Sequence, residues 1–77
     1  MANSTNLDPS GVYWIMLRKK GEKRYALHLA GRGETRLKIH AAQFRAEDAA
    51  RVLADVVPNN PEWEFRATLV PPRARVL

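Results

Sequence analysis

A chain of 77 residues has room for one folded domain, and the absence of cysteine excludes disulfides and thiolate metal sites. Thirteen Lys and Arg residues against eight Asp and Glu residues give a net charge of +5, which favours acidic partners. The longest apolar run, residues 12–17, is much shorter than the roughly 20 residues of a transmembrane helix. We therefore expect a cytoplasmic protein that does not enter a membrane.

The two ends of the chain differ in composition from its middle. Residues 1–10 are mostly Asn, Ser, Thr, Asp and Pro, which predicts a disordered leader. Residues 71–77 begin with two prolines and carry Arg73 and Arg75, which predicts a flexible basic tail. A single α+β domain is expected over residues 11–70.

The first two predicted strands are residues 12–19 and 24–30. The first is rich in β-branched and aromatic residues, has apolar side chains on both faces, and is followed by the turn signal Lys20-Gly21. The second alternates between an apolar and a polar face, as a half-exposed strand does. Its core face would carry Tyr25, Leu27 and Leu29, and its outer face Arg24, Ala26 and His28.

A three-residue hairpin loop at 31–33 is predicted next, with Gly33 able to adopt the left-handed conformation at its last position. The third strand would then span residues 35–40. We expect Leu37 and Ile39 on its core face. The outer face would carry Arg36, Lys38 and His40.

From residue 46 to residue 57 the apolar period changes to that of a helix. The apolar stripe consists of Ala49, Val52, Leu53 and Val56. Pro58 is expected to stop this helix, and Phe44 to pack just before it. Residues 62–70 alternate again and predict a last strand with its odd-numbered side chains in the core.

These elements follow the order β-β-β-α-β, which predicts an α+β fold: a four-stranded mixed sheet with one helix packed on one face. Because strand 12–19 is apolar on both sides, we place it centrally, in the spatial order 3-2-1-4. The order 1-2-3-4 is the alternative. In both orders the helix returns the chain to the other end of the sheet, so strand 62–70 is expected to run parallel to its neighbour.

Positive charge concentrates in residues 18–38, which hold eight basic and two acidic side chains, a balance of 8 − 2 = +6. On the predicted strands these charges share one sheet face and two turns. Like charges opposed across strands repel, so the pattern does not serve stability and suits the phosphates of DNA or RNA. The alternative is that these Lys and Arg residues only keep an exposed sheet soluble and protect its edges from pairing. The predicted nucleic-acid-binding residues are Arg18, Lys19, Lys20, Lys23, Arg24, His28, Arg32, Arg36, Lys38 and His40.

Strand 12–19 also predicts an uncovered apolar strip. One helix covers one side of a sheet, so either the even-numbered or the odd-numbered side chains of this strand lie on the open side. A two-residue turn at Lys20-Gly21 would bury the even set, and a three-residue turn the odd set. With Trp14, Ile15 and Met16 as contact residues, the strip suits a protein partner or a homodimer, unless the leader or the tail folds over it.

Nothing in the sequence predicts catalysis, a cofactor or a metal site. Both serines lie in residues 1–10, and Thr35 and Thr68 lie in strands without an evident base. His28 and His40 would be separated by roughly 13 Å along the strands, too far to share a metal ion. The sequence therefore predicts a small non-enzymatic nucleic-acid-binding module. The alternative is a protein-interaction or inhibitor module of phage or plasmid type that binds an acidic protein or itself.

Overall fold

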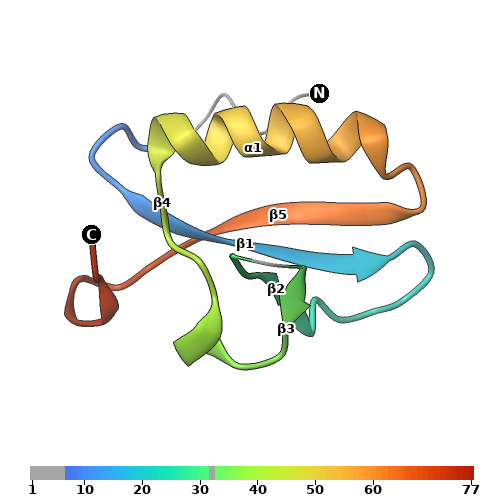
Figure 1. Ribbon diagram of the computed structural model, residues 1–77, viewed down its shortest axis with the longest axis horizontal. Helices are drawn as coiled ribbons and strands as arrows, with labels where there is room; N and C mark the ends of the chain where they lie inside the picture. Colours follow the sequence, from blue (N-terminus) through green and yellow to red (C-terminus); the bar gives the residue numbers. More distant parts are fainter. Residues whose placement is uncertain (1–6, 32) are drawn as a thin grey trace.

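The computed structural model describes residues 7–31 and 33–77. Figure 1 shows α1 lying along one face of a curled sheet. Within the described residues, no helix combines the length and the apolar character needed to cross a membrane. The elements are β1 (Val12–Lys19), β2 (Leu27–Leu29), β3 (Glu34–Thr35), the 3-10 turn η2 (Lys38–His40), β4 (Phe44–Arg45), α1 (Ala46–Asn59), β5 (Trp63–Leu69) and the 3-10 turn η3 (Pro72–Ala74).

The sheet is built around β1. Along one edge, β5 pairs with it from Tyr13 opposite Leu69 to Lys19 opposite Trp63. The other edge is shared, because β4 pairs with the start of β1 and β2 with its later half, while β3 pairs with β2. The α+β class and the order 3-2-1-4 for the predicted strands are confirmed, with β4 as an additional short strand.

The direction predicted for the last strand is wrong. Every pairing in the described sheet is antiparallel, β5 with β1 included, so the sheet is not mixed. The predicted strand 35–40 leaves the sheet after Thr35, and η2 adds a reversal that brings the chain to the start of β1. From there α1, about 21 Å long at 1.5 Å per residue, carries the chain to the far end, and β5 has to return antiparallel.

Both predicted turns also differ from the structure. In the first connection Met16 lies opposite His28, so residues 20–26 form a longer link than either turn considered for Lys20-Gly21. In the second, the predicted three-residue loop 31–33 would place Glu34 opposite Ala30, whereas Glu34 lies opposite Leu29, one residue away. A shift of one residue exchanges the faces of a strand. Because β3 ends at Thr35, Leu37 and Ile39 are not in a strand and miss the core, with 55% and 84% of their surfaces exposed.

The main core lies between β1 and α1. The buried residues of this cluster are Tyr13, Ile15, Ala46, Ala49 and Leu53, so the odd-numbered side chains of β1 face the helix. Phe44, Phe65 and Ala67 pack partly against them, as the sequence predicts. α1 continues through Pro58 to Asn59, because a proline in the last turn removes only one hydrogen bond near a helix end.

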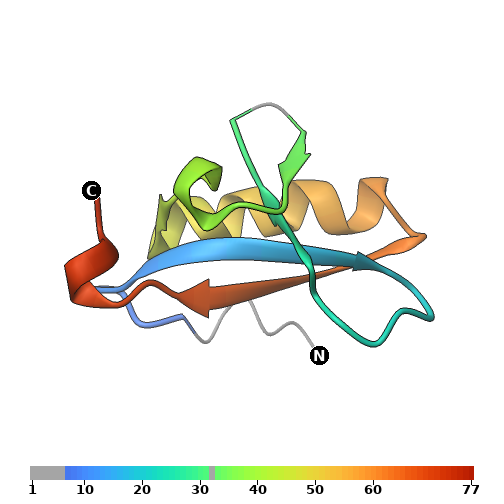
Figure 2. The same cartoon turned by 90° about the horizontal axis from the view of Figure 1, so that it is seen from below.

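A second cluster closes the opposite face of β1, which Figure 2 shows from below. Val12, Trp14 and Val70 are buried there, with Ala41 and Ala74 packed against them. Gln43 fastens this cover: its Nε2 donates to the Ala74 carbonyl at 2.8 Å, and its Oε1 accepts from the Val76 N–H at 3.0 Å. The segment predicted as a tail thus contributes η3 to the fold.

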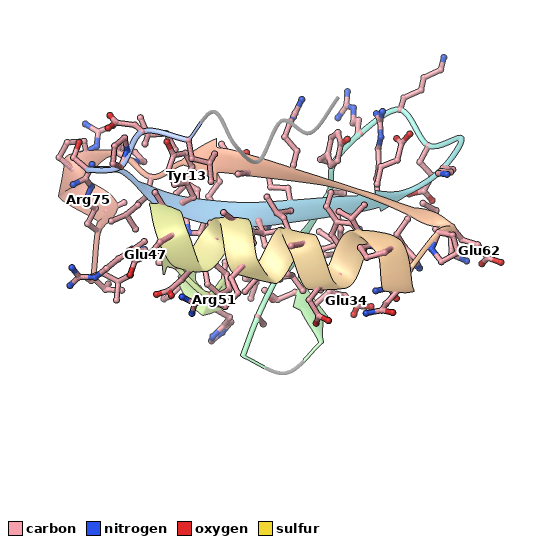
Figure 3. The ribbon with its side chains drawn as sticks, turned by 90° about the horizontal axis from the view of Figure 1, so that it is seen from above. Tyr13, Glu34, Glu47, Arg51, Glu62 and Arg75 are labelled. Atoms are coloured by element: carbon pink, nitrogen blue, oxygen red, sulfur yellow. The ribbon has the colours of Figure 1, made fainter. Side chains whose placement is uncertain are left out.

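Part of the predicted leader is also placed. Residues 1–6 lie outside the described residues, whereas Leu7 packs against the main core. The Asp8 N–H donates a hydrogen bond of 2.8 Å to the Tyr13 hydroxyl. Figure 3 shows Tyr13 at the same end of the molecule as Arg75. Both terminal segments therefore meet the domain near the start of β1.

Candidate nucleic-acid interface

A basic groove lies at the other end of β1. Its apolar lining comes from Leu17 and Leu27, which are opposite each other in the sheet, and from Trp63, which is opposite Lys19. The groove has a volume of about 550 Å³. Its charged lining consists of Lys19, Lys23, Arg24 and Arg36 with one acid, Glu22.

Three stretches that are separate in the sequence meet at this groove: residues 17–27, Arg36 and Trp63. Lys19 ends β1, Lys23 and Arg24 lie in the connection 20–26, and Arg36 directly follows β3. Trp63 comes from the first position of β5. Four cations against one acid leave a local balance of 4 − 1 = +3, so a phosphate in the groove would meet several positive charges at once.

Trp63 is the site residue that sequence reasoning missed. Its position in an alternating strand predicts a core side chain, yet it is only partly buried. The Lys19 Nζ lies 5.8 Å from the centroid of its ring, and the ring also lines a second hollow of about 350 Å³ beside Tyr25 and Phe65. The sequence signal that could have indicated an exposed Trp63 was its position at the start of the last strand, beyond the apolar stripe of α1.

Arg18 holds the connection 20–26 in place. Its Nε donates to Glu64 Oε1 at 2.7 Å, and its Nη1 donates to the Lys23 carbonyl at 3.0 Å. The bond to Glu64 raises the pKa of Arg18. Because these donors are occupied, we assign Arg18 a positioning role for Lys23.

Tyr25 lies between two guanidinium groups. The Cζ atoms of Arg18 and Arg66 are each 4.3 Å from the centroid of the Tyr25 ring. Cations at this distance are attracted to the face of an aromatic ring. Together with the hydrogen bonds of Arg18, this stack holds the connection 20–26 in place. It lies on the face of the sheet opposite the helix, where Glu64 and Arg66 lie beside Arg18 and Met16.

His28 is not part of the basic surface predicted for it. It is 4% exposed, and its ring meets Trp14 edge-on with a centroid separation of 6.1 Å. Burial lowers the pKa of His28. The Lys38 charge lowers the pKa further, and the Thr35 backbone raises it in part. Neither ring nitrogen has a hydrogen-bond partner among the described residues. We therefore treat His28 as a neutral, buried residue at pH 7.

The remaining residues that the sequence predicts to bind nucleic acid divide into three groups. Lys20, Lys38 and His40 are exposed but do not line the groove, and Lys38 Nζ lies 5.2 Å from the centroid of the Trp14 ring. Arg32 lies outside the described residues. The third group, Lys19, Lys23, Arg24 and Arg36, is brought together at the groove.

The prediction of an exposed apolar strip on strand 12–19 is wrong, because the strip is covered in the structure. Ile15 is fully buried under α1, and Trp14 is 7% exposed beneath the second cluster. Met16 is partly buried. The strip is covered because the chain leaves the sheet after β3 and η3 folds back, so that Ala41 and Ala74 reach the face that the helix does not cover.

Within residues 7–31 and 33–77, no group of three or more acidic, His or Cys side chains is placed to hold a metal ion. Comparison of the chain with protein-family models, curated proteins and solved structures finds no match. Its function therefore has to be argued from the groove and its surroundings.

Proposed function

We propose that this protein is a small non-enzymatic nucleic-acid-binding module, acting in the cytoplasm, whose contact surface is the basic groove. The observation that carries the proposal is the convergence of Lys19, Lys23, Arg24 and Arg36 around the partly exposed Trp63. The cations supply affinity for the phosphate backbone. Trp63 supplies a flat apolar surface for a base.

A single strand is the form of nucleic acid that this arrangement suits. An unpaired base can stack on an aromatic side chain, whereas the bases of a duplex are already stacked on each other. If all four cations of the groove contact phosphates, the logarithm of the binding constant should fall against the logarithm of salt concentration with a slope near −3. The proposal covers DNA and RNA alike.

The alternative hypothesis, a protein-interaction module, no longer has the exposed apolar residues on which it was based. That hypothesis depended on an apolar strip in β1, and both Trp14 and Ile15 are buried. The basic groove does not replace the strip, since five of the nine residues that line it are charged. Nucleic acid is therefore the partner that we propose.

The decisive test compares two triple variants with the same net charge. In the groove variant Lys23, Arg24 and Arg36 become Glu. In the control, the exposed residues Arg45, Arg73 and Arg75 become Glu. Each set changes the charge by six units, from +5 to −1. Binding of labelled oligonucleotides, single-stranded and duplex, is measured by fluorescence anisotropy between 50 and 200 mM salt.

We expect the groove variant to lose about tenfold or more in affinity relative to the control and about three quarters of its salt dependence, because three of the four phosphate contacts behind the slope near −3 are removed. Equal losses in both variants would mean that net charge alone drives binding. Absence of binding by the native chain at 50 mM salt would overturn the proposal.

Trp63 allows the stacking part of the proposal to be tested separately. Trp63→Leu should weaken single-strand binding by about 1–3 kcal/mol without changing the salt slope, since it removes a base contact and no charge. Trp63→Phe, which keeps an aromatic face, should lose less. A native chain that binds duplex more tightly than single strands, or a Trp63→Leu variant with native affinity, would remove stacking from the mechanism.

A further inference from the structure

β5 is an edge strand, and one of its two sides has no strand paired with it among the described residues. Among the described residues it pairs only with β1, and Figure 2 shows it along the border of the sheet opposite the β2–β3 hairpin. Its seven residues contain no proline, and its pairing with β1 has no break. A regular edge of this length presents a row of backbone donors and acceptors to another strand.

The hydrogen bonds to β1 show which backbone groups of β5 point outward. The Lys20 N–H donates to the Glu62 carbonyl at 3.0 Å, and the Val70 N–H donates to the Val12 carbonyl at 2.8 Å. In an antiparallel pair the bonded residues alternate, so the even-numbered residues of β5 bond to β1. The N–H and carbonyl groups of Trp63, Phe65, Ala67 and Leu69 therefore face the free edge.

This parity restricts how two copies of β5 can pair antiparallel, because odd-numbered residues have to oppose odd-numbered residues. With Phe65 opposite Phe65 of the second copy, Glu64 comes opposite the second copy's Arg66, and the reverse. The neighbouring registers place Glu64 opposite Glu64, with Arg66 opposite Glu62, or Arg66 opposite Arg66. Of these, only the register centred on Phe65 pairs opposite charges without opposing like ones, and it does so twice, at positions without backbone bonds where facing side chains are closest.

We propose that a second copy of this chain docks on the free edge of β5, antiparallel, with Phe65 at the two-fold axis. Three facing pairs, 65 with 65 and 63 with 67 taken twice, each exchange two backbone bonds, about six in all. Leu69 at one end of the strand is 53% exposed and Val57 beside the hollow at the other is 49% exposed, so apolar surface borders the edge. A domain of this size also gains stability from association.

Ala67→Pro tests the edge without touching an internal hydrogen bond, because the Ala67 N–H points away from β1. Mass is measured by light scattering on a sizing column over a range of concentrations, and folding by circular dichroism. We expect a concentration-dependent dimer for the native chain and a folded monomer for Ala67→Pro. A native chain that stays monomeric at the highest accessible concentration, or a folded Ala67→Pro variant that still dimerises, would overturn the proposal.

The register is tested by cross-linking, which the cysteine-free sequence makes unambiguous. A mixture of Glu64→Cys and Arg66→Cys chains should form a disulfide-linked pair under mild oxidation, while either chain alone should do so far less. Cross-linking of Arg66→Cys with itself in preference to the mixture would show the register that opposes the two Arg66 residues and would refute ours. This readout does not depend on the folding of Ala67→Pro.

The edge and the basic groove share Trp63, but the cations of the groove lie outside the edge. None of Lys23, Arg24 and Arg36 belongs to β5, so the charge-reversal variant of the groove should still dimerise. A monomer that binds oligonucleotide would leave the proposed function intact and refute only the dimer.

Discussion

The two faces of β1 are closed in different ways. On one face, Ile15 and its odd-numbered neighbours pack against the regular apolar stripe of α1. On the other, Trp14 is covered by short irregular segments, held by the two hydrogen bonds of Gln43. The second face also buries polar atoms, the His28 ring nitrogens and the Trp14 indole nitrogen, that have no partner among the described residues.

This difference indicates where the stability of the domain is concentrated. A close-packed helix against a sheet gains from burial along its whole length. Buried polar atoms without partners reduce the stability of the face that contains them. We therefore expect the helix side to carry most of the free energy of unfolding, and the Trp14 side to open first.

The largest expected effect is the truncation of Ile15. Because Ile15 is fully buried, Ile15→Ala should reduce the free energy of unfolding by about 2–5 kcal/mol, enough to unfold a marginally stable domain. The matched control is Ile39→Ala, which removes the same atoms from a side chain that is 84% exposed and should cost little. Urea denaturation measures both. Similar losses in the two variants would contradict the assigned faces.

A smaller effect is expected when the cover of the Trp14 side is loosened. Gln43→Ala removes two hydrogen bonds and should cost about 1–2 kcal/mol, and it should speed tryptic cleavage after Arg73. Asn59→Ala is the control, since it also removes two side-chain hydrogen bonds but at the end of α1. If cleavage after Arg73 is unchanged in Gln43→Ala, the Gln43 bonds do not hold this segment.

The mildest test is pH. The pKa of His28 is lowered by burial from 6.5, so below that pH the unfolded chain binds more protons at this residue than the folded one. The free energy of unfolding should therefore be unaffected by His28 well above pH 6.5 and should decline as the pH falls below it. His28→Leu should remove this part of the decline, whereas His40→Gln, an exposed control, should keep it. Identical pH profiles for the native chain and His28→Leu would contradict the burial of this ring.

Local patterns predicted those elements whose side chains repeat over several turns or strand positions. The stripe of α1 is confirmed at Ala49 and Leu53, and β1 is central as its two apolar faces indicate. For the candidate site, the basic stretch correctly contained Lys19, Lys23, Arg24 and Arg36. Trp63 was missed because alternation alone cannot show that the helix stripe ends before reaching it.

The predictions failed where a single residue of register decides a face. The slip by one position in the β2–β3 hairpin placed Thr35 opposite His28, the early end of β3 left Leu37 and Ile39 exposed, and the covering of the second face buried His28. Likewise, one additional reversal at η2 was enough to change the direction of β5. Side chains alternate with a period of two, so a small error in a turn exchanges the inside and the outside of a whole strand.

The sequence by itself determined the class of the fold, the central strand, the helix and the segment that carries the charge, because each depends on periodicity or composition within a short window. Only the tertiary structure decided which face each charge occupies, which residues close the second face of β1, and that four basic side chains meet Trp63 in one groove. These outcomes depend on turn geometry and on contacts between segments far apart in the chain, which no local pattern encodes.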